Sequence, residues 1–299
     1  MTTTPLRGAG GAGAATVAPS AEHLPRRPRT WARQPWGLWA AGAVLTVVGI
    51  ALVAPAALAT HDPYALDLGA SLQPPGGEHL LGTDVAGRDL WSRVVWGARP
   101  ALAIGVGAAA TSLVLAVVLG VLAALGPRLV AGAVDRVIEV LFSFPSLLLA
   151  LLLVALLGPS AWTQALAVGI GTAPGYARII RGQVRAVRSA PYVEAAVALG
   201  HTRARILRQH VLPNALRPLV AIAALSVGQS IVWASSLSFL GLGVAPPSPE
   251  WGALLDAGRA YVTHAWWLTV VPGVVVVALA LAATTVGNHL QAALERSEA

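Results

Sequence analysis

Side chains able to carry out covalent chemistry are scarce in this sequence of 299 residues. All 20 basic residues are arginine, so the lysine of the phosphate-binding pattern G-x-x-x-x-G-K-[ST] is missing, and the chain cannot be a P-loop ATPase by itself. The absence of cysteine excludes disulfides, thiolate nucleophiles and cysteine-ligated metal clusters. The 7 histidines show neither H-x-x-x-H nor H-E-x-x-H spacing. The sequence therefore predicts no catalytic residue, no metal site and no cofactor on this chain.

The most informative polar segment, residues 181–214, is predicted to form two short amphipathic helices beside the membrane. In the first helix, Ser189 suits the N-cap position and Pro191 is tolerated in the first turn. Gly200 suits the end of this helix, because glycine adopts a positive φ without strain. Thr202 can cap the second helix, which is expected to end before Pro213.

The second helix is expected to have a buried and an exposed face. Its apolar residues on one face are Ile206, Leu207 and Val211, which leaves the arginines Arg203, Arg205 and Arg208 facing water or a partner. A basic amphipathic segment can also bind anionic lipid headgroups, so a surface loop that only contacts the membrane is an alternative interpretation.

The elements that must position this segment are membrane helices. Hydrophobic residues make up 56% of the chain and charged residues 11%, against about 25% charged residues in ordinary soluble domains. Long apolar runs predict an all-α polytopic membrane protein with six transmembrane helices, at 36–60, 101–125, 137–158, 161–180, 215–242 and 267–290. Pro145 and Pro272 are expected to kink their spans.

The first 35 residues contain almost no large apolar side chains and are predicted to be a disordered tail. A cleaved signal peptide is the alternative, because the apolar run at 36–60 contains Ala57-Leu58-Ala59, which is similar to a cleavage site. The apolar part of a signal peptide is only about 7 to 15 residues long, so we favour an uncleaved first transmembrane helix.

The arginines predict the orientation. With six spans, sixteen of the twenty arginines lie on the side of the two termini, so the positive-inside rule places both termini in the cytoplasm. Residues 61–98 and 243–266 are then extracytoplasmic, residues 99–290 form the core, and residues 291–299 are a cytoplasmic C-terminus. The same distribution of charge argues against a nucleic-acid partner, whose basic residues would form a stripe on a soluble fold.

Other polar and aromatic residues have structural interpretations. Glu139 is expected to pair with Arg136 at i,i+3 spacing and not to face a translocation path. Three tryptophans near an extracytoplasmic boundary, Trp251, Trp266 and Trp267, are expected to be interfacial anchors. Asp84, Arg88 and Asp89 have two interpretations: they contact an extracytoplasmic partner or seal the outer mouth of the bundle, or they form a structural cap.

Five fixed features of segment 181–214 carry a family resemblance. Glu194-Ala195-Ala196 is followed after three residues by Gly200, and after nine more by His210-Val211-Leu212-Pro213. This pattern resembles the signature E-A-A-x3-G-x9-I-x-L-P of the permease subunits of bacterial ABC importers, with His210 in place of isoleucine. Histidine at this position is frequent in the peptide-importer branch.

The resemblance extends over nearly the whole chain after Trp36. Segments similar to the C-type subunit of dipeptide, oligopeptide and nickel permeases are 81–84 (LGTD), 87–89 (GRD), 97–99 (GAR), 144–145 (FP), 236–243 (SLSFLGLG) and 251–252 (WG). The likeness weakens in the last span, where Gly287-Asn288 and Gln291-Ala292 replace the usual Gly-Asp pair and Arg-Asp pair.

The resemblance implies a type I ABC importer permease fold and a non-catalytic transport subunit in a bacterial plasma or inner membrane. It implies a second, homologous permease subunit as a heterodimer partner, two P-loop ATPase subunits that bind ATP and Mg, and an extracytoplasmic substrate-binding protein. The residues implied to couple the chain to an ATPase are Glu194, Ala195, Ala196, Gly200, His210, Leu212 and Pro213, with Arg203, Arg205 and Arg208 at the rim. We refer to residues 181–214 as the coupling loop.

The implied substrates are dipeptides or oligopeptides, with nickel or another small solute as the alternative, and no substrate-binding residue is predicted. A more distant alternative is an ATP-independent secondary transporter or channel subunit. Such proteins commonly show inverted repeats or charges within their spans, neither of which this sequence displays.

Overall fold

The computed structural model describes residues 35–296, and the predicted tail of residues 1–35 lies outside this part except for its last residue. Within it the fold is helical, with one isolated bridge between Thr83 and Asp89 and no named strand. The elements are α1 Pro35–Val53, η2 Pro55–Ala57, η3 Leu68–Ala70, α2 Leu90–Leu125, α3 Arg128–Ser143, α4 Ser146–Leu157, α5 Ala161–Arg188, α6 Pro191–Ala198, α7 Arg203–Ile206, η4 Leu207–Val211, α8 Leu212–Leu216, α9 Leu219–Leu237, η5 Ser238–Leu242, α10 Trp251–Arg259 and α11 Trp267–Arg296.

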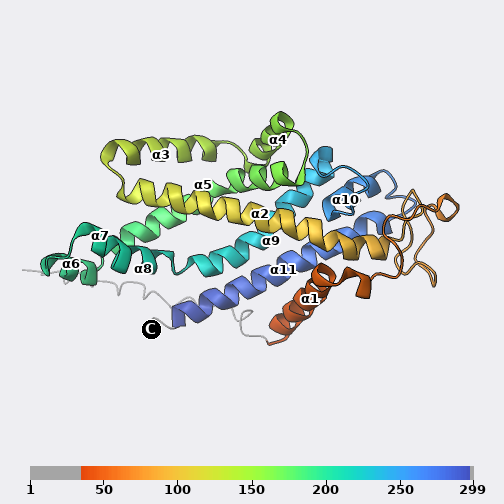
Figure 1. The fold of residues 1–299 in the computed structure, drawn as a ribbon, viewed down its shortest axis with the longest axis horizontal. Coiled ribbons are helices and arrows are strands. Elements are labelled where there is room, and N and C mark those ends of the chain that lie inside the picture. Colours follow the sequence, from red (N-terminus) through yellow and green to blue (C-terminus); the bar gives the residue numbers. More distant parts are fainter. Residues whose placement is uncertain (1–34, 297–299) are drawn as a thin grey trace, which may run out of the picture.

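The long helices α2, α5, α9 and α11 run along the length of the molecule (Figure 1). The short helices α6, α7 and α8 lie at one end, and the loops between α1 and α2 lie at the other. Small residues allow close helix packing in this bundle. A Cβ on Gly120 of α2 would meet the Ala177 carbonyl oxygen of α5 at 2.8 Å, and one on Gly105 would meet Ile231 of α9 at 2.3 Å.

Four helical segments are long and apolar enough to cross a membrane, namely Trp36–Val53, Leu90–Leu125, Leu219–Leu242 and Trp267–Leu294. A fifth is present if the bent pair α3 and α4 counts as one span. The predicted span at 161–180 is part of α5, which has 28 residues and continues to Arg188 but is more polar than these four segments.

The span predicted at 137–158 is bent at Pro145, as expected, but the bend is sharper than a kink within one helix. The chain forms two helices there, α3 and α4, bent by 93°. Phe144 has an extended backbone with ψ 136°, as expected for a residue before proline, and Pro145 has no N–H to continue the helix. Helix α3 carries charges instead of a continuous apolar surface: Arg136 pairs with Glu139 at 2.9 Å, as predicted, and Asp135 pairs with Arg181 of α5 at 2.6 Å.

Residues 54–89 form a folded cap over the start of α2, and its charged residues hold it together. Asp84 accepts a hydrogen bond from Arg88 at 2.8 Å and also pairs with Arg93 at 3.5 Å. Asp89 is the N-cap of α2 and accepts from the Ser92 backbone N–H at 2.8 Å. Burial opposes ionisation of Asp89, but hydrogen bonds from Ser92 and His79 outweigh it, so its pKa lies below the ordinary value. These contacts favour the structural-cap interpretation.

Two of the three tryptophans predicted as interfacial anchors are instead buried. Trp251 is 1% exposed and donates through Nε1 to the Val94 carbonyl at 2.9 Å. Trp267 is 5% exposed and donates to the Thr83 carbonyl at 3.2 Å. Only Trp266 of the three is exposed. Trp251 thus attaches the start of α10 to α2, and Trp267 attaches the start of α11 to the cap.

Candidate functional site

The coupling loop projects from the end of α5 as a short helix with one anchored face. In α6, Val193 and Ala196 are buried against the cluster that includes Ile180 and Val184 of α5. Glu194 and Ala195 are exposed, and within the described residues the Glu194 carboxylate has no ion pair. Leu199 and Val197 are also exposed, at 77% and 60%. The helix therefore presents a carboxylate beside apolar side chains that no described part of this chain covers.

The end of α6 is a Schellman motif, which explains the role of Gly200. The Gly200 N–H donates to the Val197 carbonyl at 2.9 Å, and the His201 N–H donates to the Ala196 carbonyl at 3.1 Å. Gly200 has φ +77°, a conformation that costs an L-residue energy. The predicted helix end at Gly200 is thus confirmed, and it turns the chain toward α7.

The start of α6 differs from the prediction. Ser189 is not its N-cap but the C-cap of α5, where its hydroxyl donates to the Ala186 carbonyl at 3.1 Å and the Arg185 carbonyl at 3.2 Å. Ala190 takes the N-cap position without a side-chain bond, and Pro191 occupies the first turn as predicted. Helix α5 continues farther than expected, to Arg188, so the Ser189 side chain bonds to the end of α5 and not to the start of α6.

The second helix of the loop begins as predicted and ends differently. Thr202 caps α7, and its hydroxyl oxygen accepts from the Arg205 N–H at 3.3 Å. The helix does not end before Pro213 but continues through the π-helical turn η4 into α8, where Pro213 lies in the first turn. A π turn shifts the hydrogen-bonding register, so the proline with no N–H can be accommodated within a continuous helical path.

Among the predicted motif residues, His210 contacts aromatic rings of the first half of the loop. The rings of His201 and His210 are stacked with centroids 6.1 Å apart, and Tyr192 of α6 lies 6.5 Å from His210. His210 thus packs the second helix of the loop against the first. Leu212 is half-buried and Pro213 is exposed. The buried residues of this second helix are Ile206 and Val211, with Leu207 partly buried, as predicted.

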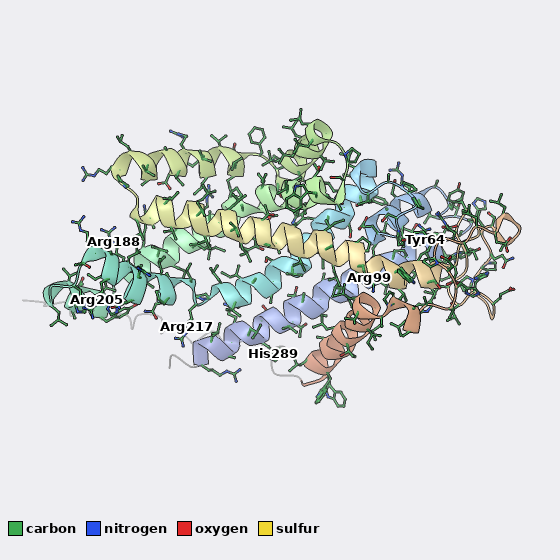
Figure 2. The ribbon with its side chains drawn as sticks, in the orientation of Figure 1. Tyr64, Arg99, Arg188, Arg205, Arg217 and His289 are labelled. Atoms are coloured by element: carbon green, nitrogen blue, oxygen red, sulfur yellow. The ribbon has the colours of Figure 1, made fainter. Side chains whose placement is uncertain are left out.

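The predicted rim arginines Arg203, Arg205 and Arg208 are all exposed. Arg205 donates to the side-chain oxygen of Gln209 at 2.9 Å. Figure 2 shows Arg188, Arg205 and Arg217 together at the end that carries α6, α7 and α8, while Tyr64 lies at the opposite end. This end of the molecule is positively charged.

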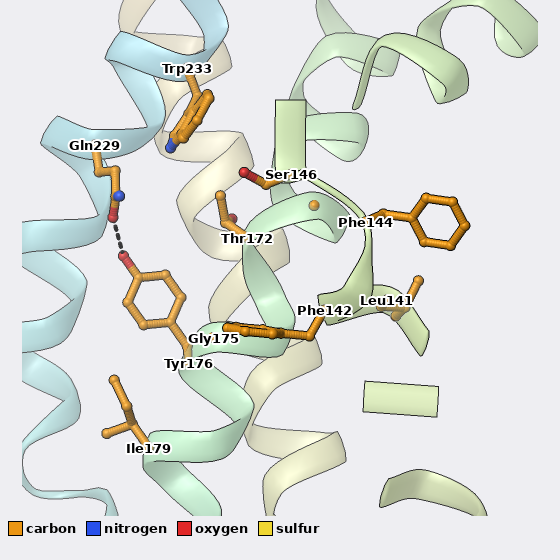
Figure 3. Close-up of a pocket in the computed structure, with 11 residues that line it drawn as sticks. Leu141, Phe142, Phe144, Ser146, Thr172, Gly175, Tyr176, Ile179, Gln229 and Trp233 are labelled. Carbon is orange, nitrogen blue, oxygen red and sulfur yellow. Dashed lines mark hydrogen bonds between the residues drawn. The ribbon is translucent and has the colours of Figure 1, made fainter. Parts of the chain in front are cut away.

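An open cleft of about 370 Å³ lies between α3, α4, α5 and α9, away from the coupling loop. Its walls carry aromatic and neutral polar side chains, including Phe142, Ser146, Thr172, Tyr176, Gln229 and Trp233 (Figure 3). The Tyr176 hydroxyl donates to the Gln229 side-chain oxygen at 2.9 Å across the cleft. Among the described residues no charged side chain lines the cleft directly, although the Arg178 guanidinium stacks on the Phe142 ring at 3.7 Å.

Sequence reasoning did not find these lining residues. They come from four helices, and their placement depends on the 93° bend after α3, which brings Phe142 and Ser146 toward α5. Gly171 also contributes, because a Cβ there would meet the Ser146 carbonyl oxygen at 2.9 Å. A usable signal was present in the run of small and polar residues at 164–176, which indicated close packing only.

The comparison with known families identifies residues 116–298 as matching the family described as "Binding-protein-dependent transport system inner membrane component". The chain is 40% identical over 239 residues to the probable D,D-dipeptide transport system permease protein of Escherichia coli K12, covering 80% of each chain. It is 39% identical over 258 residues to the di/tripeptide transport system permease protein of Pseudomonas aeruginosa UCBPP-PA14, covering 84% of this chain and 85% of that one.

A solved structure described as inward facing conformations of the MetNI methionine ABC transporter has a similar fold, with a TM-score of 0.56 and 19% identity. The match covers 68% of this chain and 96% of that one. An amino acid ABC transporter matches with a TM-score of 0.52 and 18% identity, covering 66% of this chain and 90% of that one.

Proposed function

Because the chain belongs to the family of binding-protein-dependent transport system inner membrane components, we propose that it forms half of the translocation path of an ATP-driven importer of dipeptides or oligopeptides. It is a multi-pass transport permease and not a catalytic subunit. ATP and Mg are bound by two P-loop ATPase subunits, a second homologous permease supplies the other half, and an extracytoplasmic binding protein delivers the substrate.

The observation that carries this proposal is the uncovered surface of α6. The exposed Glu194 carboxylate, which has no ion pair within residues 35–296, forms a small docking face with the exposed Val197 and Leu199. The helix that carries this face is fixed to α5 through Val193 and Ala196. Since α5 is one 28-residue helix that lines the cleft at Thr172 and Tyr176, a displacement of α6 by an ATPase is transmitted to the cleft as a rigid-body movement.

The proposed topology has six crossings, with the bent pair α3 and α4 counted as one and α5 as another. Both termini are cytoplasmic, and the cap formed by residues 54–89 is extracytoplasmic. The gathering of arginines beside α6 to α8 supports this orientation, because basic residues are enriched on the cytoplasmic side (Figure 2).

The cleft is the proposed substrate path. Its hydroxyl, indole and amide groups can hydrogen-bond the peptide backbone, and a lining without charged groups among the described residues avoids selection among charged side chains. The neutral lining therefore supports peptides over a metal cation, which would need carboxylate or imidazole ligands.

The function is tested by reconstituting the chain with its partner permease and ATPase subunits in proteoliposomes. We expect uptake of a labelled dipeptide that requires both ATP and the binding protein. A solubilised chain that never associates with an ATPase subunit would contradict the proposal.

Replacing Glu194 with lysine is expected to weaken copurification with the ATPase subunits by about tenfold or more. The variant loses a charge-assisted contact and adds a like charge to an already basic end. The measurement is the ATPase-to-permease ratio after affinity purification. Glu139→Lys is the matched control, because Glu139 is also exposed and its loss removes only a surface ion pair worth less than about 1 kcal/mol. Equal ratios for both variants would refute the role of Glu194.

Replacing Gln229 with leucine is expected to raise the dipeptide concentration for half-maximal uptake by about fivefold, since one hydrogen bond is worth about 1 kcal/mol. The change keeps the side-chain size, removes the acceptor of the Tyr176 hydroxyl and leaves the coupling loop untouched. Thr46→Val on α1 is the control, because among the described residues the Thr46 hydroxyl donates only to the Gly42 carbonyl of its own helix. An unchanged half-maximal concentration would show that Gln229 is not part of the substrate path.

A further inference from the structure

Three side chains in the cap form a cluster that the coupling and transport roles do not use. The Nδ1 atom of His79 lies 3.0 Å from Oδ1 of Asp89, and that of His61 lies 3.8 Å from the same oxygen. The two imidazole rings are 4.9 Å apart, and one ligand atom from each of the three residues lies within 4.8 Å of the others. Spacing in the sequence predicted no metal site because these residues are 18 and 10 positions apart.

The backbone holds each of the three residues in place. The N–H groups of Thr60 and His61 donate to the Ser92 hydroxyl at 3.2 and 3.0 Å. The His79 carbonyl accepts from the N–H groups of Gly76 and Gly82, and Asp89 is fixed as the N-cap of α2. The cluster is therefore a consequence of the folded cap and not of three mobile side chains.

The two oxygens of Asp89 have separate tasks. Its Oδ2 accepts from the Ser92 N–H at 2.8 Å and the Thr60 hydroxyl at 3.4 Å, which completes the helix cap. Its Oδ1 faces only the two histidines among the contacts of the described residues. One oxygen can thus bind a cation while the other keeps the start of α2 in place.

We propose that His61, His79 and Asp89 form a binding site for a divalent transition-metal cation such as Zn²⁺. Two imidazoles and one carboxylate are ligands that Zn²⁺ accepts with a fourth position left to water. Zinc–nitrogen and zinc–oxygen bonds of about 2.0–2.2 Å in a tetrahedron place ligand atoms about 3.3–3.6 Å apart. The two separations from Asp89, 3.0 and 3.8 Å, bracket this range.

The half-exposed edge of the cluster leaves the metal accessible. The His61 side chain is 41% exposed, whereas His79 is 13% and Asp89 1% exposed, so a cation can enter beside His61 without opening the fold. A bound cation joins the segment after α1 to the start of α2, and this stabilises the cap. The proposal does not depend on the transported substrate or on the coupling loop.

The test uses the full chain in detergent, purified without a polyhistidine tag and stripped of metal with EDTA. Isothermal titration with Zn²⁺ alone is expected to give one site per chain, and saturating Zn²⁺ is expected to raise the Tm by about 5 °C. Mg²⁺ and Ca²⁺, which prefer oxygen ligands, are expected to leave the Tm unchanged.

The decisive variant is His61→Asn, because the exposed His61 ring contributes little to the fold. We expect at least about tenfold weaker zinc binding and a metal-free Tm within about 2 °C of the parent. His264→Asn, an exposed histidine whose ring contacts only its neighbour Thr263, is the control and should bind zinc like the parent. His79→Asn should also lose zinc binding. If zinc has no effect on the parent, or if it stabilises parent and His61→Asn equally, the site does not exist.

Discussion

Replacing Gly200 with valine is expected to lower ATP-driven import at least about tenfold while the chain still inserts and folds. Gly200 has φ +77°, and this left-handed conformation costs a β-branched residue more than about 1–2 kcal/mol. A Cβ at this position meets no atom within 4 Å, so the effect is conformational and not a clash. The valine variant must unwind the Schellman motif, which changes the direction in which α6 presents Glu194.

Two further variants separate this effect from general damage. Gly200→Asn is expected to retain most of the import, because asparagine tolerates the left-handed region. Gly132→Val on α3 introduces the same side chain at an exposed helical glycine with no neighbour and is expected to import normally. Uptake is measured in proteoliposomes alongside copurification with the ATPase. Normal import by Gly200→Val would show that the end of α6 does not couple the chain to the ATPase.

Local chemistry made most of the coupling loop predictable. The Gly200 turn, the Thr202 cap and the buried face of the second helix follow from residues within a few positions of one another. The errors at Ser189 and Pro213 have a different source. Ser189 can cap either the end of α5 or the start of α6, and the outcome depended on how far α5 continued. Pro213 can either end a helix or lie in a first turn, and the outcome depended on a π turn. Both the length of α5 and the π turn are set by tertiary packing.

Features that need distant segments to meet were not predictable in this way. Pro145 predicted a kink in the apolar run at 137–158, but it did not predict that the chain turns by 93° there. Trp251 is typical of a membrane interface by composition, but its indole N–H reaches the Val94 carbonyl 157 positions away. The cleft and the histidine cluster likewise join side chains from several elements. The small and polar residues at 164–176 indicated close packing but not a cleft, and the spacing of the histidines did not indicate a cluster.

Replacing Gly97 with alanine is expected to lower the free energy of unfolding by about 1–3 kcal/mol, although alanine normally favours a helix. Gly97 lies in α2 where the segment before α10 crosses it. A Cβ there would approach the Pro249 carbonyl oxygen to 2.2 Å and the Trp251 ring to 2.8 Å. The Pro249 carbonyl belongs to the backbone, and Trp251 is buried and bonded to Val94, so neither can move aside cheaply.

The matched control for Gly97 is Gly49→Ala in α1, another apolar helix, where a Cβ meets nothing within 4 Å. This variant is expected to be neutral or stabilising, because glycine in a helix interior costs about 1 kcal/mol relative to alanine. Denaturant titration in detergent and the yield of folded protein measure both changes. If Gly97→Ala were as stable as Gly49→Ala, the close approach of α2 to Pro249 would not be required for the fold. A loss confined to Gly97→Ala would show that the attachment of α10 to α2 holds the cap end of the bundle together.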